Sequence, residues 1–302
     1  VDTVLGACGL SRVNLIYIGG GHCYLLLPNT KAAKQAVQDV NDCTNDWLID
    51  QFGTALFVAH GWAECSADDL TNTPAENAPY KAIFQRVSSA VGRHKIKRYS
   101  ARQIRRLNRP QSGLDGRECK VCGSTDAIKD DRCGWCARIE QLSIKIQDEA
   151  RVAYVVSRGA DKYDMPLPGG AYLSLADEQT ARDMLKTGGV MRVYTKNHAY
   201  TGMAYSARLD ICDYYASNQN AELAQRSEGI RRLAVCRLDV DNLGHAFVAG
   251  FEDDAAADVT ARYRFVTLSR TAALSRQLSL FFKRYMREVL TQGEALDVSV
   301  VY

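Results

Sequence analysis

Apolar positions near the start of the chain are arranged first as two short runs and then at helical spacing. The runs, residues 14–18 and 23–27, flank Gly19-Gly20-Gly21-His22, which predicts a β-hairpin closed by a tight turn. The stretch from residue 13 to residue 30 carries no charge, but its glycines, proline and histidine favour a buried hairpin over a membrane-spanning helix. Residues 31–51 then place apolar side chains near every third or fourth position, which predicts an amphipathic helix.

The segments that follow alternate between strand-like and helical patterns. Residues 55–59 form a short apolar run typical of a strand, and a helix is expected from residue 80 to about residue 90. The first part of the chain should therefore fold as β-β-α-β, part of a ferredoxin-like sheet. In the middle, residues 152–156 and 171–175 are strand-like, and residues 176–186 are helical.

Beyond residue 200 the pattern is again that of an α+β unit. Residues 233–238 predict a strand, residues 267–291 a long helix, and residues 296–302 an alternating strand. This β-α-α-β order would open the architecture whose closing part begins the chain. We predict two partial ferredoxin-like domains, residues 1–92 and 231–302, with a linker and insert domain over residues 93–230.

Composition is that of a folded protein, with its positive charge concentrated in one place. The chain is 46% hydrophobic and 24% charged, and its 302 residues suggest two domains at roughly 150 residues each. Net charge is only +3, yet residues 93–109 hold eight Lys or Arg and no acid. This basic segment could follow an RNA backbone or be the solvated face of a helix that joins two modules. The second interpretation is favoured.

Four of the ten cysteines form a metal-binding pattern. Cys119, Cys122, Cys133 and Cys136 make two Cys-x-x-Cys pairs, whereas the other six are scattered. In a reducing cytoplasm, where we expect the protein to reside, this spacing predicts zinc rather than a disulfide framework. Four thiolates fill the tetrahedral shell of Zn2+, so the site would be structural. Redox-active or coincidental thiols are the alternative.

An acidic turn is the second candidate site. Asp239 and Asp241 lie two residues apart at the end of a predicted strand, so their side chains would point to the same face. Carboxylates in that arrangement suit Mg2+ or Mn2+, and the loop that follows could meet phosphate groups. Taken alone, an Asp-x-Asp pattern more often caps a helix or forms a turn.

Longer stretches resemble a known family. Residues 233–247, Leu-Ala-Val-Cys-Arg-Leu-Asp-Val-Asp-Asn-Leu-Gly-His-Ala-Phe, together with residues 268–271 and 274–282, resemble a palm domain. It is the second palm of the large signature subunit of type III-A (Csm-type) CRISPR effector complexes. Residues 16–30, Ile-Tyr-Ile-Gly-Gly-Gly-His-Cys-Tyr-Leu-Leu-Leu-Pro-Asn-Thr, resemble the glycine hairpin of the first palm. The four-cysteine module lies between them, as in that family, and the resemblance spans essentially the whole chain.

The resemblance implies a fold and an activity. The fold is α+β, with two partial palm domains akin to those of nucleotidyl cyclases and polymerases, separated by the zinc module. The second palm would join ATP into cyclic oligoadenylates when the complex holds crRNA paired with target RNA. Metal-assisted chemistry of this kind aligns the attacking hydroxyl and neutralises charge on the phosphates.

The resemblance also implies roles for particular residues. Asp239 and Asp241 are the catalytic carboxylates: Asp239 would bind Mg2+ or Mn2+ with the Val240 carbonyl, and Asp241 would support the turn. A first ATP would meet a pocket lined by Asn242, Gly244, Phe247 and Ser279. A second ATP would face Gly19, Gly20, Gly21 and His22. A packing or solvent-facing serine is an equal interpretation of Ser279, and a tight turn by itself requires at least one of the glycines.

The sequence departs from the family pattern in two respects. It contains no Gly-Gly-Asp-Asp tetrapeptide, which completes the metal site of the second palm, and no His-Asp dipeptide, which marks the N-terminal nuclease domain. We therefore expect a fragment that also lacks the C-terminal domain and is inactive on its own. The complete protein should bind ATP, crRNA, target RNA and sibling Csm-type subunits, and no membrane.

Two other functions compete with this one. The palms could be a non-catalytic scaffold that holds crRNA and sibling subunits, which the presence of Asp239 disfavours. The chain could instead be a stand-alone diguanylate-type cyclase, against which the zinc insert and the paired palms argue.

Overall fold

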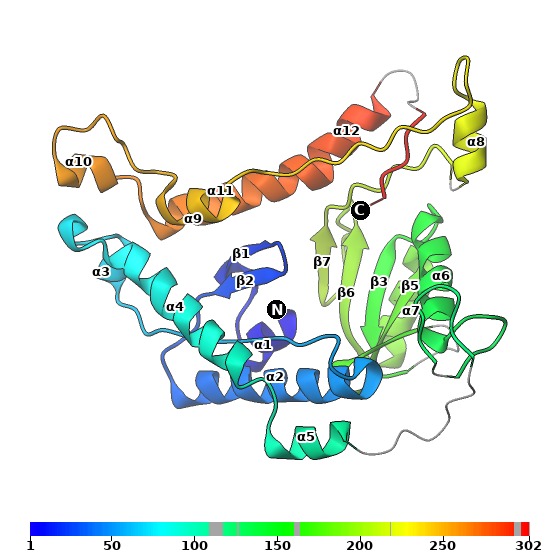
Figure 1. Ribbon diagram of the computed structural model, residues 1–302, viewed down its shortest axis with the longest axis horizontal. Coiled ribbons are helices and arrows are strands. Elements are labelled where there is room, and N and C mark those ends of the chain that lie inside the picture. Colours follow the sequence, from blue (N-terminus) through cyan, green and yellow to red (C-terminus); the bar gives the residue numbers. More distant parts are fainter. Residues whose placement is uncertain (109–116, 126, 160–163, 218, 293–296, 302) are drawn as a thin grey trace. The chain divides into compact units, whose positions relative to one another are not determined.

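The computed structural model describes residues 1–108, 117–125, 127–159, 164–217, 219–292 and 297–301, which divide into two units (Figure 1). Unit 1 joins residues 1–108 to residues 235–279, and unit 2 joins residues 109–234 to residues 280–302. Each unit holds both helices and a sheet, so the α+β class is confirmed. Among the described helices, none combines the length and the apolar character needed to cross a membrane.

Unit 1 begins with the predicted hairpin and helix. Strands β1 (Leu15–Gly19) and β2 (His22–Leu25) pair antiparallel, with Gly19 opposite His22. The helix α2 spans Lys31–Phe52, and the hydroxyl of its N-cap Thr30 accepts the Ala33 N–H at 3.1 Å. The remaining elements of this segment are α1 (Asp2–Ala7), η1 (Arg12–Asn14), α3 (Ala67–Leu70), η2 (Ala75–Asn77), α4 (Pro79–Ile96) and α5 (Ala101–Leu107).

The strand predicted over residues 55–59 is wrong. This segment is extended, but two buried asparagine side chains of α2 take the place of a neighbouring strand. Asn45 Oδ1 accepts the Val58 N–H at 2.9 Å, and the amide groups of Asn41 and Asn45 both donate to the Val58 carbonyl at 2.9 Å. Because buried backbone groups must find partners, these side chains allow the segment to pack without a sheet.

The second segment of unit 1 is mainly helical. The strand predicted over residues 233–238 is also wrong: no strand pairs with it in the described part of the chain, and Val235 is 94% exposed. Helices α9 (Leu243–Ala249) and α10 (Val259–Tyr263) follow. The predicted long helix is confirmed: it begins in unit 1 as α11 (Leu268–Leu280) and continues into unit 2 as a π-helical turn η4 (Phe281–Tyr285) and α12 (Met286–Thr291).

Unit 2 is built on a five-stranded sheet with the order β4-β5-β3-β6-β7. Its strands are β3 (Ala153–Ser157), β4 (Met165–Leu167), β5 (Ala171–Ala176), β6 (Val190–Lys196) and β7 (Ser206–Leu209). All pairs are antiparallel except β6 with β7. Helix α7 (Glu178–Thr187) packs on β3, β5 and β6, and its Ala181 joins Val155 and Val193 in a fully buried core. The sequence pattern predicts β3, β5 and α7 but not β4, β6 and β7. Helices α6 (Gly134–Gln147) and α8 (Asn220–Gln225) complete the unit.

A buried ion cluster joins parts of unit 2 that are distant in sequence. The Asp213 carboxylate, 7% exposed, meets Lys196 Nζ of β6 and Arg287 Nε of α12, each at 2.8 Å. Asn197 Nδ2 donates to the same carboxylate at 2.8 Å. Of the strand predicted over residues 296–302, residues 297–301 are described, and Ser299 forms an antiparallel bridge with Tyr215. The remainder of that prediction lies outside the described residues.

Candidate functional site

The glycine hairpin is a two-residue turn that requires glycine. Gly20 and Gly21 have φ values of +55° and +75°, a pair typical of a type I′ turn, which L-residues with a Cβ adopt at a cost. A Cβ at Gly19 would lie 2.8 Å from the Tyr17 hydroxyl. His22 Nδ1 lies 2.9 Å from the Gly20 carbonyl oxygen, and its side chain is exposed. Backbone conformation thus accounts for Gly20 and Gly21, and a tight contact accounts for Gly19.

Replacing Gly20 or Gly21 by Ala should lower the free energy of unfolding by roughly 1–2 kcal/mol, because the left-handed conformation is strained for alanine. Space does not limit either change, since no atom lies within 4 Å of the added Cβ. The control is Gly92→Ala, also unobstructed but inside helix α4, which should raise stability by about 0.5–1 kcal/mol. Urea unfolding of the three variants checks the signs; a hairpin variant as stable as the parent protein would contradict the turn assignment.

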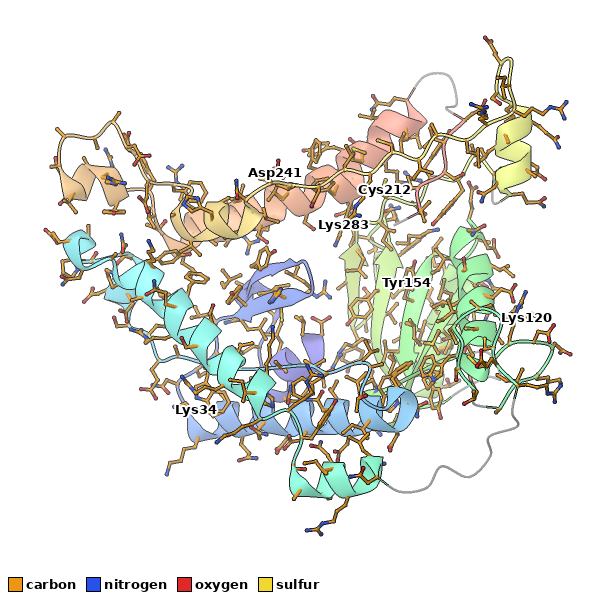
Figure 2. The ribbon with its side chains drawn as sticks, in the orientation of Figure 1. Lys34, Lys120, Tyr154, Cys212, Asp241 and Lys283 are labelled. Carbon is orange, nitrogen blue, oxygen red and sulfur yellow. The ribbon has the colours of Figure 1, made fainter. Side chains whose placement is uncertain are left out.

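The acidic turn lies directly before α9. Asp239 and Asp241 are exposed, and Figure 2 shows Asp241 in the extended segment that leads into the helix. Asp239 Oδ1 accepts the N–H of Val240 at 3.0 Å, so this carboxylate retains free lone pairs for a cation. Asn242 has φ +54°, a left-handed conformation that asparagine tolerates, and it starts the helix without a side-chain cap. A Cβ added at Gly244 would meet no atom within 4 Å apart from its chain neighbours and its own helix backbone.

Packing brings the glycine hairpin and α9 together within unit 1. The ring of Phe247, in α9, lies 4.3 Å from the ring of Tyr17, in β1, centroid to centroid. Phe247 is buried, whereas its neighbours Asn242 and Gly244 are exposed. Ser279 is half-buried and lies eight residues beyond Thr271 on α11, about 12 Å along the helix axis. The structure thus connects the hairpin with Phe247, and gives no contact between Ser279 and either group.

Sequence reasoning missed the residues that support this arrangement. Tyr80 of α4 and Thr271 of α11 are each 1% exposed, and the Tyr80 hydroxyl donates to Thr271 Oγ1 at 2.6 Å. Burial raises the pKa of Tyr80, and burial together with Tyr24 raises the pKa of Tyr17. Both tyrosines are therefore neutral hydroxyl groups at physiological pH. An aromatic residue one position after a proline at a helix start was the available signal, and it is weak.

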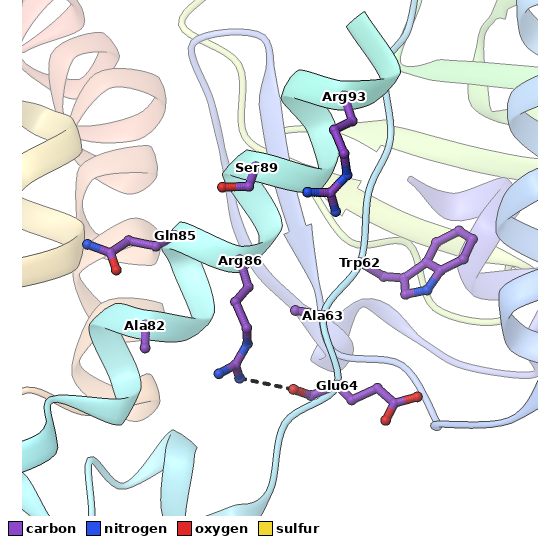
Figure 3. Close-up of a pocket in the computed structure, with 8 residues that line it drawn as sticks. All are labelled: Trp62, Ala63, Glu64, Ala82, Gln85, Arg86, Ser89 and Arg93. Atoms are coloured by element: carbon purple, nitrogen blue, oxygen red, sulfur yellow. Dashed lines mark hydrogen bonds between the residues drawn. The ribbon is translucent and has the colours of Figure 1, made fainter. Parts of the chain in front are cut away.

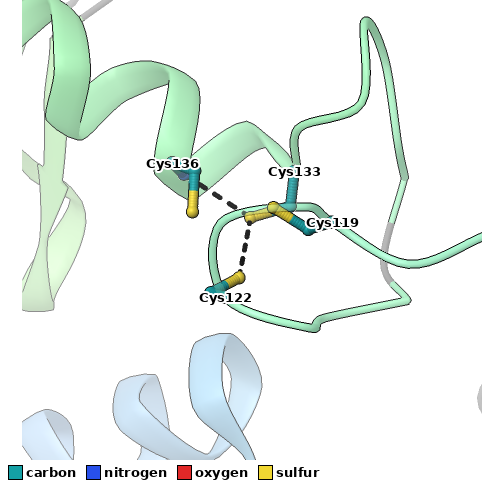
Figure 4. Close-up of side chains that lie close together, drawn as sticks. All are labelled: Cys119, Cys122, Cys133 and Cys136. Carbon is teal, nitrogen blue, oxygen red and sulfur yellow. Dashed lines mark hydrogen bonds between the residues drawn. The ribbon is translucent and has the colours of Figure 1, made fainter.

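The four predicted cysteines converge on one point of unit 2 (Figure 4). Their sulfur atoms all lie within 4.8 Å of one another, and Cys122 Sγ is 3.6 Å from Cys133 Sγ. A tetrahedral zinc shell with bonds of about 2.3 Å places its sulfurs about 3.8 Å apart, so the cluster fits zinc. Cys119 and Cys133 are buried with Ile128 against Trp135. Gly123, with φ +72°, permits the tight turn after the first pair.

Backbone groups prepare the cluster to hold a cation. Hydrogen bonds from the backbone, with that at Cys133 the strongest, lower the pKa of the Cys119 thiol to about 6. Burial and the neighbouring thiols raise the pKa of Cys136. A thiolate can bind a divalent cation at once, and the bound cation then displaces the protons of the neighbouring thiols.

A surface groove of about 630 Å³ lies along α4 (Figure 3). Arg86 and Arg93 project from one face of the helix towards residues 62–64. The two arginines lie two turns apart, about 10 Å along the helix axis. Arg86 Nη2 donates to the Glu64 carbonyl at 3.1 Å, and the Glu64 carboxylate is paired with Lys34 Nζ at 2.6 Å. Two guanidinium groups beside a neutralised carboxylate give the groove a positive character.

The basic segment continues from this helix into α5. Arg102 and Arg106 form ion pairs with Asp46 and Asp50 of α2, so two of the three cations on this short helix attach it to α2. Gln103 Nε2 adds a hydrogen bond to Asp46 at 2.7 Å. The ion pairs agree with the favoured interpretation of a helix face that joins modules. Arg109 lies outside the described residues.

Comparisons with known proteins identify the class and then the family. The family description "Cas10/Cmr2, second palm domain" matches residues 232–302, and "Csm1 subunit domain B" matches residues 1–110. These matches define a palm-domain protein of the Cas10 class. Curated relatives named "CRISPR system single-strand-specific deoxyribonuclease Cas10/Csm1 (subtype III-A)" are 39% identical in Mycobacterium tuberculosis and 35% identical in Enterococcus italicus. The alignments cover 99% and 100% of this chain. The chain belongs to the Cas10/Csm1 family of subtype III-A CRISPR systems.

The match covers only part of each relative. The chain spans 38% of the length of both curated proteins. Among solved structures, Csm1 of T. onnurineus aligns at 17% identity with a TM-score of 0.61, over 96% of this chain and 33% of that one. A Csm1–Csm4 cassette in complex with one ATP aligns at 18% identity with a TM-score of 0.65, over 96% of this chain and 35% of that one. A cassette in complex with cA4 aligns at 19% identity with a TM-score of 0.61, over 96% of this chain and 34% of that one. These likenesses confirm the fold.

Proposed function

We propose that this chain provides the two palm segments with which a Cas10/Csm1 protein binds ATP and joins it into cyclic oligoadenylates. The observation that carries the proposal is the packing of Phe247 on Tyr17, which connects α9, the helix after the acidic turn, with the glycine hairpin. Related Csm1–Csm4 cassettes in complex with one ATP and with cA4 support it. The class of activity is nucleotidyl transfer, in the cytoplasm, within an RNA-guided complex of crRNA, target RNA and sibling Csm-type subunits.

Each site residue has a role in this proposal. Asp239 binds Mg2+ or Mn2+ with the Val240 carbonyl, and Asp241 supports the turn. Asn242, Gly244 and Phe247 line the pocket of one ATP, and Ser279 contacts its adenine. Gly19, Gly20, Gly21 and His22 face the second ATP. When bound, the divalent metal neutralises charge on the phosphates of the reacting nucleotide.

Zinc is the structural cofactor in this proposal. The sulfur spacing and the backbone groups around Cys119 support four thiolate ligands from Cys119, Cys122, Cys133 and Cys136. Four protein ligands leave no open coordination position, so this metal would fix the module and take no part in nucleotidyl transfer.

Oligoadenylate formation by the complete protein tests the function. The protein is assembled with crRNA and sibling subunits, supplied with ATP and Mg2+ or Mn2+, and analysed for products with and without target RNA. Cyclic oligoadenylates that depend on target RNA are the expected result. A complex that binds target RNA but leaves ATP unchanged would instead favour a scaffold role.

The ion pairs of α5 lead to a prediction for RNA binding by the basic segment. Replacing Arg102 and Arg106 by Gln should leave the salt dependence of RNA affinity unchanged and lower stability by at most about 1 kcal/mol, because both guanidiniums are partly exposed and already paired. Replacing Lys97 and Arg105, which have no ion pair within the described segments, should flatten the slope by roughly 1.5 units, because each lost phosphate contact removes about 0.7–0.9. Filter binding across a salt series measures both. A flatter slope with the Arg102 and Arg106 variant would mean that these residues contact RNA.

A further inference from the structure

A chain of two hydroxyl groups lies at the contact between the two palm segments. Tyr80 is the second residue of α4, and Thr271 lies in the first turn of α11, 191 residues later. The Tyr80 hydroxyl donates to Thr271 Oγ1 at 2.6 Å, and Thr271 donates in turn to the Phe247 carbonyl oxygen at 3.3 Å. Each hydroxyl has one hydrogen and donates it once, so this chain of hydrogen bonds runs in a single direction, from α4 through α11 to α9.

The end of this chain meets a carbonyl that α9 cannot satisfy itself. Helix α9 ends at Ala249, so the Phe247 carbonyl is among the last four, which lack a partner within the helix. Phe247 and Thr271 are both buried, and a buried acceptor without a donor costs free energy. The Thr271 hydroxyl therefore fixes where the last turn of α9 lies.

Fixing this turn also fixes the residues on either side of the proposed nucleotide pocket. Helix α9 has only seven residues and starts immediately after Asn242, so its position sets that of the acidic turn. The Phe247 ring also rests on Tyr17, whose hydroxyl lies close to Gly19 in the hairpin. A displacement of about 1 Å of reacting groups is enough to slow a reaction by about 100-fold.

We propose that Tyr80 and Thr271 are positioning residues for nucleotide binding: their hydroxyl chain sets the spacing between the acidic turn and the glycine hairpin. This inference rests on the proposed function. Neither side chain touches the nucleotide. Both act through Phe247, so the loss of either hydroxyl should weaken ATP handling while the rings and methyl groups that fill the core stay in place.

Substitutions that remove only a hydroxyl test this role. Tyr80→Phe keeps the ring that packs on Phe84 at 5.1 Å, and Thr271→Val keeps the volume of the side chain. Thr271→Ser retains the hydroxyl and is the rescue variant. Tyr24→Phe is the matched control, because Tyr24 packs on the same Phe84 at 5.2 Å and no hydrogen bond of its hydroxyl is present within the described segments.

Three measurements on the complete protein in its complex separate the outcomes. We expect Tyr80→Phe and Thr271→Val to raise the KM and Kd for ATP at least fivefold and to speed hydrogen exchange in residues 242–249. Both should also lower Tm by a few degrees, because each removes a buried hydrogen bond. Thr271→Ser and Tyr24→Phe should stay within twofold of the parent protein.

Unchanged ATP binding alongside faster exchange would overturn the positioning role. An equal loss of ATP affinity in Tyr24→Phe would show that general packing, and not the two hydroxyl groups, determines ATP binding, which would also overturn the positioning role. Parent protein that binds ATP but forms no oligoadenylate would refute the proposed function, while ATP affinity still tests positioning; parent protein that binds no ATP would refute both.

Discussion

Asp239→Ala should abolish oligoadenylate formation by the complete protein in its RNA-bound complex. In our proposal the Asp239 carboxylate would hold the divalent metal that neutralises charge on the triphosphate, and its remaining lone pairs are available for that role. Loss of an anionic ligand from such a site costs about 3–5 kcal/mol of transition-state stabilisation, a fall of roughly two to four orders of magnitude in rate. Product formation with Mg2+ or Mn2+ is measured by chromatography.

The controls keep this result specific to the metal. Asp254→Ala removes another exposed carboxylate of unit 1, which is paired with Arg262 at 2.8 Å, and should leave the rate unchanged. Affinity for target RNA should be the same in all variants. The 302-residue chain on its own should form no product. A complex that works equally well with alanine at position 239 would refute the metal role, and turnover by the 302 residues alone would refute the expectation that they are inactive.

Zinc removal should unfold the cysteine module of unit 2. We expect one zinc per chain when the protein is purified without chelator, and near-zero content in Cys133→Ser. The folding free energy contributed by such sites is on the order of 10 kcal/mol, far more than the small cluster of Ile128, Trp135 and the cysteines could supply by burial. Elemental analysis gives the metal content, and limited proteolysis reports the loss of structure around residues 117–136.

Two further observations check the zinc assignment. Cys43→Ser changes an exposed cysteine of α2 and should alter neither metal content nor proteolysis. Because zinc binds thiolates, zinc should be released as the pH falls and protons compete for the sulfurs. Zinc that persists in Cys133→Ser, or a parent protein without zinc, would show that the four thiols serve another purpose.

Features set by neighbouring residues were predictable from the sequence. The hairpin could be predicted because Gly20 and Gly21 adopt a conformation that few other residues accept. The zinc module could be predicted because the cysteine spacing itself encodes the turns that bring the sulfurs together. The long helix over residues 267–291 carried its own periodic pattern.

Features set by distant partners were not predictable. The strand expected at residues 55–59 failed because Asn45, on another element, supplies the hydrogen bonds that a neighbouring strand would have given. Strand β6 was missed because its sequence mixes the buried Val193 with the charged Arg192 and Lys196. Lys196 is accommodated through Asp213 and through the Ile146 carbonyl, to which its Nζ donates at 3.3 Å, and no local pattern indicates either partner.

The division of unit 1 into two separate stretches of chain has a consequence during synthesis. A ribosome adds about 5–20 residues per second, so the 191 residues between Tyr80 and Thr271 take roughly 10–40 s to produce. Throughout that interval the apolar surfaces of α4 and of the hairpin have emerged without α9 and α11 to cover them. The five-stranded sheet of unit 2, complete at Leu209, can form before then. The hairpin and α4 of the nascent chain therefore stay without their packing partners α9 and α11 until the second segment of unit 1 has been made.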